Sequence, residues 1–432
     1  MNKIKYMFLY FALCGVYLNA QTDVDAQLRL RFENFNNIND KYYGTNPKLG
    51  TKNDSYLLSR VRLGLTHTLN DNLKVRISMQ DSRVIGWGFK DEDWYSKEFG
   101  MQNNPQKDEL ELSQTYLEYK NSGFKTVLGR QKIAYGDNRV FGPGEWKNSG
   151  KWIWDALKVS YKQNNNFIDI FYGGTMLHDT DKFSLSHRHG YMGGGLYGHY
   201  EYKKSAAFEP IIAYKENGDG NELYKNLENY YIGFRTYDKN IMNFFYDVTY
   251  IKSFGKKTLL SSDKVDIDAY GYHADFGYNL KKLKTKLALA YTYATGDNPS
   301  TKNTEKFDSV FGASDKYYGR LNLFSWGNIK DYEINSVIKP SKDIKIKFEY
   351  HKFYADQPTD KWKSYQIATM KNDHYGDEMD VVVKYDYSKS INLVFGASYF
   401  IAGNFIDEAS TKNNFITNNN GYGFFTQFTY TY

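Results

Sequence analysis

The sequence predicts an all-β protein, a transmembrane antiparallel up-and-down β-barrel of about 18 strands. Three observations support this prediction. The chain has 432 residues with 41 Tyr and 29 Phe but only 7 Pro, so residues that favour strands are abundant and strand breakers are scarce. No apolar stretch reaches the roughly 18 residues that a membrane helix needs, which excludes a helical membrane protein. Apolar and polar residues instead alternate along segments long enough for a tilted membrane strand.

The first 20 residues form a separate unit. Lys3 and Lys5 make a basic start, residues 6–18 are apolar but too short to span a bilayer, and Ala20 offers a small residue for cleavage. This pattern predicts a secretory signal peptide at 1–20 and leaves 21–432 as one outer-membrane barrel domain. A short N-terminal anchor is the alternative. Cys14, the only cysteine, lies in this leader, so the mature chain has no disulfide and no thiol chemistry.

The alternation begins at once and recurs to the end of the chain. In 24–35, Leu28, Leu30 and Phe32 alternate with Arg29 and Arg31, and the turn residues Asn70-Asp71-Asn72 separate the next two strands. Strands are predicted at 24–35, 55–69, 73–80, 110–119, 124–133, 152–162, 167–177, 191–203, 207–217, 227–238, 241–253, 265–280, 283–296, 329–340, 343–356, 376–387, 391–403 and 420–432.

Loop lengths and the last strand favour the bacterial outer membrane. If the chain starts in the periplasm, every tight turn falls on the periplasmic rim and every long segment on the other rim. The final strand places aromatic residues on one face and ends on Tyr432, which looks like the signal read by the barrel-insertion machinery. An ordinary amphipathic edge strand is the alternative. A solenoid would need a sequence repeat, and a soluble sandwich would rarely expose so many aromatics.

The strand faces that point inward can be assigned from the alternation, because a charge on the lipid face costs about 2–4 kcal/mol near the midplane. The expected inward cations are Arg29, Arg31, Arg60, Arg62, Lys74, Arg76, Lys158, Arg235, Lys284, Lys286, Lys345 and Lys347. The expected inward anions are fewer: Glu33, Glu118, Asp169, Asp247 and Glu349.

An excess of inward cations predicts an anion-selective pore. Arginine forks bind carboxylates in a bidentate manner, which suits a polyuronate or an organic acid. We expect Arg60, Arg62 and Arg76, on two strands joined by a tight turn, to form one basic patch. The alternative is that the arginines satisfy Glu33, Glu118 and each other as a structural network in the wall.

The stretch 124–161 organises the chain. It consists of two strands and a loop longer than the roughly 12–15 residues beyond which loops are usually functional. The loop carries Gly136-Asp137-Asn138-Arg139 and Trp146-Lys147-Asn148. The order Leu128-Gly129-Arg130-Gln131, then Tyr135-Gly136-Asp137, then Trp146 and Asn148, then Trp154-Asp155-Ala156-Leu157 resembles the alginate-export family of outer-membrane barrels. Residues 60–65 and 80–83 are similar to early strands of that family.

The resemblance implies a passive outer-membrane porin that exports an anionic, alginate-like polysaccharide. It also implies that Arg130 and Asp155 lie on the conduit, although both share parity with outward leucines, so that Arg130 would need a bulge at Gly129 and Asp155 belongs at the rim unless the register changes. The expected conduit residues are Arg29, Arg31, Arg60, Arg62, Arg76, Glu118, Arg130, Arg139, Asp155 and Lys158.

Two further functions remain open. An uptake porin for small acidic solutes would have the same strand number and basic ladder, and a structural or adhesive barrel would have loops folded inward and negligible conductance. We expect no enzyme, no cofactor and no nucleic-acid partner, since no hydrolase, zinc-protease or P-loop motif is present. The expected partners are the anionic substrate, outer-membrane lipid and the insertion machinery, and the expected state is a monomer.

Three weaker patterns have ordinary explanations. Residues 193–198 match GxGxxG, but within a strand they are better read as glycines against which aromatics pack. His178, His187, His189 and His199 lie near Asp179 and Asp181 and could bind a divalent ion, yet we expect a solvated loop. The carboxylates Asp91, Glu92, Asp93, Glu98, Asp108 and Glu109 could bind calcium, but their spacing is not that of an EF-hand. No metal site is therefore predicted.

Overall fold

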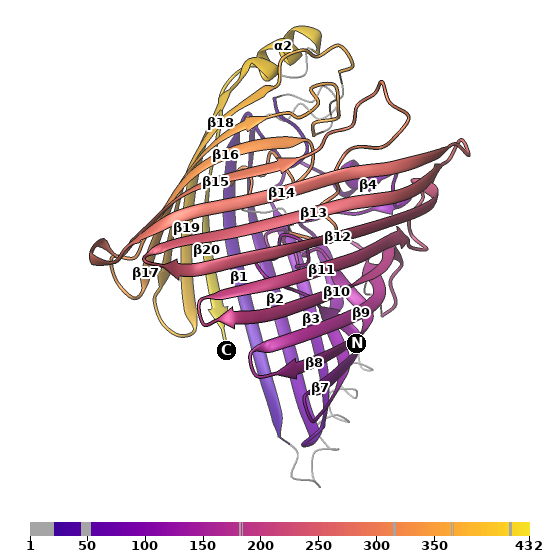
Figure 1. The fold of residues 1–432 in the computed structure, drawn as a ribbon, viewed down its shortest axis with the longest axis vertical. Coiled ribbons are helices and arrows are strands. Elements are labelled where there is room, and N and C mark those ends of the chain that lie inside the picture. Colours follow the sequence, from indigo (N-terminus) through magenta and orange to yellow (C-terminus); the bar gives the residue numbers. More distant parts are fainter. Residues whose placement is uncertain are drawn as a thin grey trace.

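A computed structural model describes residues 21–44, 53–180, 183, 185–313, 317–363, 365, 367–413 and 417–432. It shows a closed antiparallel barrel (Figure 1), in which 18 strands form one sheet. β1 pairs with β2 on one side and with β20, the last strand, on the other. The predicted fold class is confirmed, and closure removes the exposed sheet edges. The predicted signal peptide at 1–20 lies outside the described residues.

The barrel strands follow the predicted alternation. They are β1 (Thr22–Asn36), β2 (Asn53–Asn70), β3 (Leu73–Ile85), β6 (Asp108–Asn121), β7 (Phe124–Lys132), β8 (Ile153–Gln163), β9 (Asn166–Met176), β10 (His189–Lys203) and β11 (Ala206–Asn217). They continue with β12 (Tyr224–Ile241), β13 (Phe244–Leu259), β14 (Lys264–Leu280), β15 (Thr285–Ala294), β16 (Ile329–Ile338), β17 (Ile344–Tyr354), β18 (His374–Asp386), β19 (Ile391–Ala402) and β20 (Gly421–Thr431).

The loops contain short elements that the alternation does not predict. A 3-10 helix, η1 (Asp91–Trp94), and a small hairpin of β4 (Tyr95–Ser96) and β5 (Met101–Gln102) lie between β3 and β6. A second 3-10 turn, η2 (Lys281–Leu283), joins β14 to β15. Helix α2 (Asn404–Lys412) follows β19, and its Phe405, Ile406 and Ala409 are buried on one face. No helix in the described part of the chain is long and apolar enough to cross a membrane.

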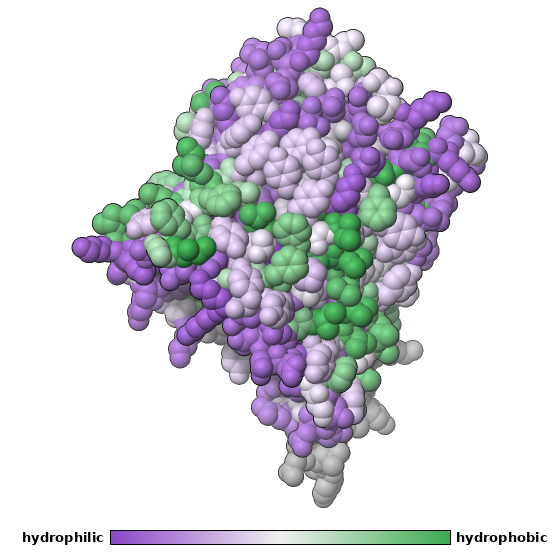
Figure 2. Space-filling model, viewed as in Figure 1, coloured by the Kyte–Doolittle hydropathy of each residue, from purple (hydrophilic) through white to green (hydrophobic). Residues whose placement is uncertain are grey.

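The outer face of the barrel is apolar, as the alternation requires. Leu63, Leu128, Ile170, Phe276 and Leu289 are exposed there, on strands spread around the barrel. Figure 2 shows hydrophobic and pale aromatic side chains over the middle of one outer face and hydrophilic side chains gathered towards the loops at the top. This band is the surface that faces lipid.

Two long loops fill part of the lumen. The first joins β7 to β8 (133–152) and is here called the constriction loop; the second joins β15 to β16 (295–328). They pair with each other: the amide of Phe311 donates to the carbonyl of Val140 at 3.1 Å, and the amide of Gly142 donates to the carbonyl of Phe311 at 3.1 Å. Aromatic side chains of both loops pack with inward residues of the strands, among them Tyr135, Phe141, Trp154, Phe171, Tyr197, Phe307, Phe311 and Tyr318.

The glycine run at 193–198 serves this packing. A Cβ atom on Gly195 would meet the ring of Phe141, and one on Gly193 would meet Phe311. The run lies within β10, so the glycines let the two loops approach the wall closely, as predicted.

Candidate functional site

The constriction loop crosses the lumen from one wall to the opposite wall. Near its start, Gly136 lies against Tyr197 of β10 and Arg235 of β12. Further along, Trp146 packs edge-to-face on Phe425 of β20, with ring centroids 4.7 Å apart. The loop therefore narrows the space through which any solute must pass.

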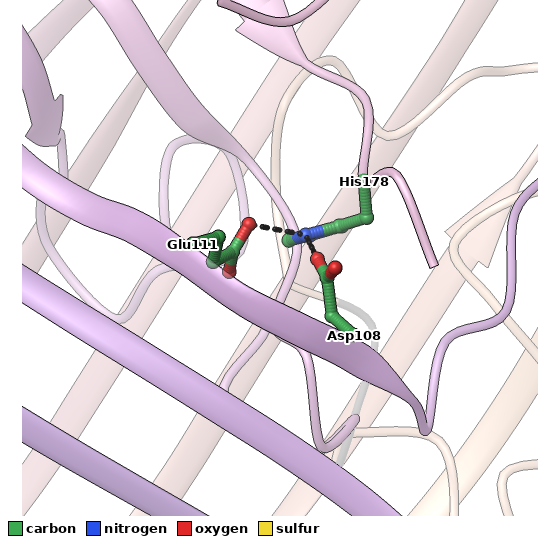
Figure 3. A group of neighbouring side chains, drawn as sticks. All are labelled: Asp108, Glu111 and His178. Carbon is green, nitrogen blue, oxygen red and sulfur yellow. Dashed lines mark hydrogen bonds and ion pairs between the residues drawn. The ribbon is translucent and has the colours of Figure 1, made fainter. Parts of the chain in front are cut away.

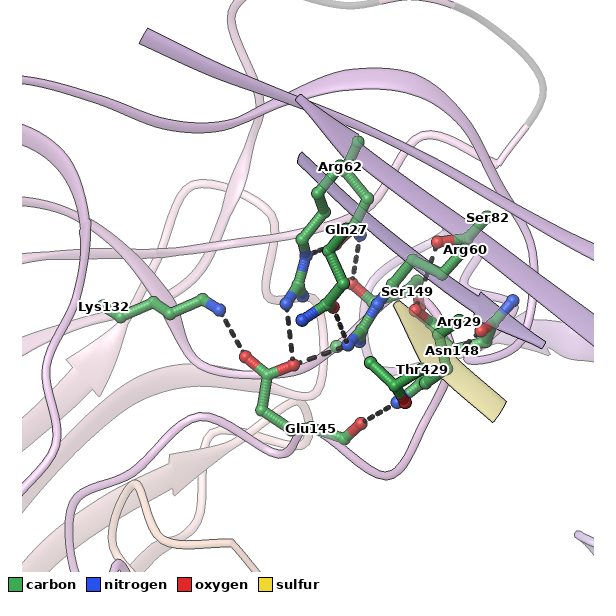
Figure 4. A network of polar contacts seen from close by, with 12 residues as sticks. Gln27, Arg29, Arg60, Arg62, Ser82, Lys132, Glu145, Asn148, Ser149 and Thr429 are labelled. Carbon is green, nitrogen blue, oxygen red and sulfur yellow. Dashed lines mark hydrogen bonds and ion pairs between the residues drawn. The ribbon is translucent and has the colours of Figure 1, made fainter. Parts of the chain in front are cut away.

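Glu145 of this loop is bound by three cations (Figure 4). Its Oε2 lies 3.0 Å from Nη1 of Arg60 and 3.0 Å from Nη1 of Arg62, both on β2, and its Oε1 accepts from Lys132 of β7. Burial by itself would raise the pKa of Glu145, but Arg62, Lys132 and Arg60 together lower it well below its usual 4.5. The carboxylate is therefore charged at neutral pH.

Asn148 fixes the loop to the wall by its side chain. Its Nδ2 donates to the carbonyls of Ser59 at 2.9 Å and Arg83 at 3.0 Å, and its Oδ1 accepts from Nη2 of Arg29 at 2.9 Å. Arg29 also donates to the carbonyl of Glu145 at 2.7 Å. Because Asn148 is fully buried, these contacts tie the loop to β1, β2 and β3 at once.

Arg31 is the most enclosed of the predicted conduit arginines. Its Nε lies 2.6 Å from Oε1 of Glu33, and its guanidinium lies 4.0 Å from the centre of the Trp146 ring. Tyr56 donates to the other oxygen of Glu33 at 2.6 Å. Arg31 thus has a structural partner, which is the wall network given above as the alternative role.

Arg76 lies apart from Arg60 and Arg62, so the expectation of one patch of three arginines is wrong. The β2–β3 register places Arg62 opposite Gln80 but Arg76 opposite Thr66, much nearer the turn. Arg76 pairs there with Asp25 at 2.8 Å. Position 76 is closer to the turn than position 60, and in a hairpin only residues at equal distances from the turn face each other.

The remaining predicted conduit residues fall into separate groups. Near the short-turn rim, Lys158 lies 3.4 Å from Asp169, and Glu118 lies 4.0 Å from Lys125. Arg139, on the constriction loop, lies 3.1 Å from Asp137 and stacks on Tyr317 of the second loop at 4.4 Å.

Arg130 and Asp155 form a bidentate pair with both contacts at 2.8 Å. The register is continuous on both sides of Gly129, so Arg130 keeps the parity of the exposed Leu128 and Asp155 that of the exposed Leu157. The Arg130 side chain is nevertheless buried, next to Gly129 with its φ of +122°, and the pair lies at the end of its strands near the long-loop rim. Because the two side chains satisfy each other, neither is counted among the proposed conduit groups.

The lumen also holds inward acids beyond the five that the alternation predicted. On β16 and β18 these are Asp331, Glu333, Glu378 and Asp380, and β11 adds Glu209; all five are buried. Their alternation with the exposed Tyr332, Ile334 and Met379 carried the signal for this assignment. The expected surplus of cations is thus a property of the wall formed by β1, β2 and β3 rather than of the whole lumen.

Two cavities open beside the constriction loop. One of about 470 Å³ is lined by lysines together with Asp40 and Trp362: Lys41, Lys147, Lys306, Lys361 and Lys363. The other, of about 540 Å³, is lined by residues that include Trp152, Tyr191, Lys215 and Asp308. The buried Lys215 lies 2.7 Å from Asp308 and 4.9 Å from the centre of the Tyr191 ring.

The comparisons with known proteins agree with this architecture. The family model described as alginate export matches residues 21–417. No curated protein matches the chain. Among solved structures, Pseudomonas aeruginosa OccK8 (OprE) is similar with a TM-score of 0.61 and 11% identity, covering 95% of this chain and 98% of that chain.

Two further structures from Pseudomonas aeruginosa have the same fold. OpdO has a TM-score of 0.62 at 8% identity, covering 95% of this chain and 97% of its own. OpdK with vanillate has a TM-score of 0.58 at 10% identity, covering 95% and 98%.

Proposed function

Because the chain belongs to the alginate export family of outer-membrane channels, we propose that it conducts an anionic polysaccharide outward, with Arg29, Arg60 and Arg62 as the groups that the polymer's carboxylates contact. The channel is passive in this proposal: it supplies a path and a row of charges, and no reaction takes place in it.

The observation that supports the proposal is how Glu145 is bound. A carboxylate of the protein's own loop lies between two arginines of the basic wall and a lysine of β7. A uronate carries the same carboxylate group, so Glu145 marks where one unit of the polymer would bind once the loop yields. Successive units would exchange one arginine for the next, and each contact must be weak enough to release.

The lysine-lined cavity supplies the second part of the path. Lys147 belongs to the constriction loop and lies 2.5 Å from Asp40. Burial lowers the pKa of Lys363 to about 8, which still leaves most of that amine charged at neutral pH. A polymer that leaves the arginines therefore meets further cations at the long-loop rim.

The test is block of single-channel current in a planar bilayer. Oligouronates of increasing length should block the wild-type current, and neutral oligosaccharides of equal length should not. Replacing both Arg60→Gln and Arg62→Gln should weaken the block strongly, while Arg76→Gln is the matched control, because Arg76 lies apart with Asp25. An unchanged block in the double variant, with folding verified by gel mobility before and after heating, would contradict the proposal.

A second candidate is uptake of a small acidic solute, which the 540 Å³ cavity favours. Its volume suits a small molecule, and Trp152, Tyr191 and Lys215 offer ring faces and a cation. OpdK, one of the similar structures, was solved with vanillate, an aromatic acid. Vanillate should then block the current in a way that Lys215→Met abolishes and that Arg60→Gln with Arg62→Gln leaves intact.

The inward loops also fit the third candidate, a structural or adhesive barrel. It differs from both channel functions in one measurable respect, which is conductance. If the reconstituted barrel carries no measurable current at any applied voltage or acidic-solute concentration, that role is favoured.

A further inference from the structure

A buried histidine lies between two carboxylates at the long-loop rim (Figure 3). Nδ1 of His178, in the loop after β9, lies 2.5 Å from Oδ2 of Asp108 and 3.1 Å from Oε2 of Glu111, both on β6. One donor atom from each residue lies within 4.8 Å of the other two. Donors around one tetrahedral ion, with bonds of about 2.1 Å, lie roughly 3.4 Å apart, so small outward shifts would admit an ion.

The other ring nitrogen of His178 is placed as a metal-binding histidine requires. Nε2 lies 3.2 Å from the carbonyl of Gly150, to which it can donate its hydrogen. Without an ion, Nδ1 donates its hydrogen to the carboxylates. A bound ion would take the place of that hydrogen, and the hydrogen on Nε2 would stay with the Gly150 carbonyl. A backbone carbonyl in this position is the usual outer partner that fixes the tautomer of a ligating histidine.

A second observation concerns the other carboxylate oxygen of Asp108. Asp108 is 1% exposed, and its Oδ1 lacks a hydrogen-bond partner among the residues that the structure describes. Buried polar atoms without partners are rare in folded proteins and call for an explanation such as an ion.

We propose that Asp108, Glu111 and His178 bind one divalent transition-metal ion, of which Zn²⁺ is the best match. One imidazole and two carboxylates make a three-donor set of nitrogen and oxygen ligands, which zinc accepts in tetrahedral geometry with water in the fourth position. Calcium prefers six to eight oxygen ligands, and this buried set of mixed donors offers too few.

A bound ion would act on the channel through Gly150. This residue belongs to the constriction loop, and its carbonyl is held by the ring that the ion would fix. The ion would therefore join β6, the β9–β10 loop and the constriction loop into one unit. This regulatory role rests on the proposed channel function, whereas the binding site itself does not.

A second buried cluster provides the internal control. His351, Asp331 and Glu333 also bring donor atoms within 4.8 Å of one another. There, Nδ1 of His351 lies against both oxygens of a single carboxylate, Asp331, at 3.0 and 3.1 Å, so one ion pair accounts for the contact. Changes in that cluster should leave the proposed site intact.

The binding test uses full-length mature barrel in detergent, without a histidine tag, stripped with a chelator and titrated with zinc chloride by calorimetry. We expect one tight site in the wild type, its loss in His178→Ala and in the milder Glu111→Gln, and its retention in His351→Gln. Cobalt(II) should give the visible spectrum of a tetrahedral nitrogen–oxygen site. No stoichiometric zinc binding by the wild type would overturn the proposal whether or not the variants fold, and so would equal loss in His351→Gln.

A separate measurement addresses regulation. Zinc chloride should lengthen the low-conductance state of single channels, a chelator should reverse this, and Glu111→Gln should not respond. If zinc binds but the current is unchanged, the site stands and its role in gating is refuted. If the barrel carries no current, the channel function fails while the calorimetric result still decides the site.

Discussion

Oε2 of Glu145 lies 3.0 Å from Nη1 of Arg62 in the lumen. Glu145 belongs to the constriction loop, which follows β7, whereas Arg62 lies on β2 in a different part of the wall. This contact and that of Arg60 with the same carboxylate oxygen join opposite charges between the constriction loop and the basic wall. Together they decide how many arginines are available to a solute.

Replacing Glu145→Gln should free Arg60, Arg62 and Lys132 and raise the preference of the channel for anions. It should also weaken the attachment of the loop by about 1–3 kcal/mol, because a charged hydrogen-bond acceptor is lost. The reversal potential in a salt gradient measures the first effect and current noise the second. Glu92→Gln removes the same charge from an exposed loop side chain and should change neither.

The pH dependence of the conductance follows from the lowered pKa of Glu145. A carboxyl group with a lower pKa in the attached loop than its ordinary 4.5 stabilises attachment above that value, and the stabilisation is lost as the pH falls through the attached pKa. We expect constant conductance from neutral pH down to about pH 5, and an increase only in stronger acid. Glu145→Gln should lack this increase. An opening near pH 6 would instead point to a histidine.

Gly312→Ala should separate the two lumen loops. A methyl group at this position would overlap the carbonyl oxygen of Arg139, which is backbone and cannot rotate away. The indole of Trp152 also donates to the Gly312 carbonyl at 2.9 Å, so the shift would disturb a second contact. We expect a cost of about 1–3 kcal/mol, typical of overpacking, and a larger mean conductance. Ser309→Ala, in the same loop, should conduct as the wild type does.

The pair of Arg130 and Asp155 should matter for stability rather than for selectivity. Arg130→Gln or Asp155→Asn leaves a charged partner unsatisfied, which costs about 1–3 kcal/mol and should lower the temperature at which the barrel loses its compact gel mobility. Replacing both residues by Leu should cost less than either single change. A large change in ion selectivity in the single variants would place the pair on the conduit after all.

The barrel was predictable from the sequence because its strands follow a local rule. Leu63 and Arg62 must point to opposite sides of the wall wherever the chain is extended, so the alternation alone gives strand positions and faces. The turn at 71–72 could be found for the same reason, since its residue types mark it. Placing Arg76 correctly required the register between β2 and β3, which follows from counting residues outward from the turn.

The lumen loops were not predictable in this way. The partners of Asn148 are backbone carbonyls of β2 and β3, and no sequence pattern records which carbonyls a distant amide reaches. The contact between His178 and Asp108 was not predicted for the same reason. Each residue belonged to a separate weak local pattern, and only the closed barrel brings the two side chains together. Asp181, from the same predicted cluster, lies outside the described residues. Helix α2 was missed because its nine residues interrupt a loop between two clear strands.

Because Glu145 is bound by the wall cations, the channel's own loop competes with solute carboxylates for these cations. A carboxylate tethered by a short loop acts at an effective concentration on the order of millimolar, so a free monovalent acid at lower concentration seldom displaces it. A polymer with one carboxylate already bound to Arg29 or to a rim lysine presents its next carboxylate at a comparable effective concentration. That carboxylate can therefore compete with Glu145 for the arginines. Discrimination between chains and single units would then come from the number of charges that a solute presents together, even where the affinity of each charge is the same.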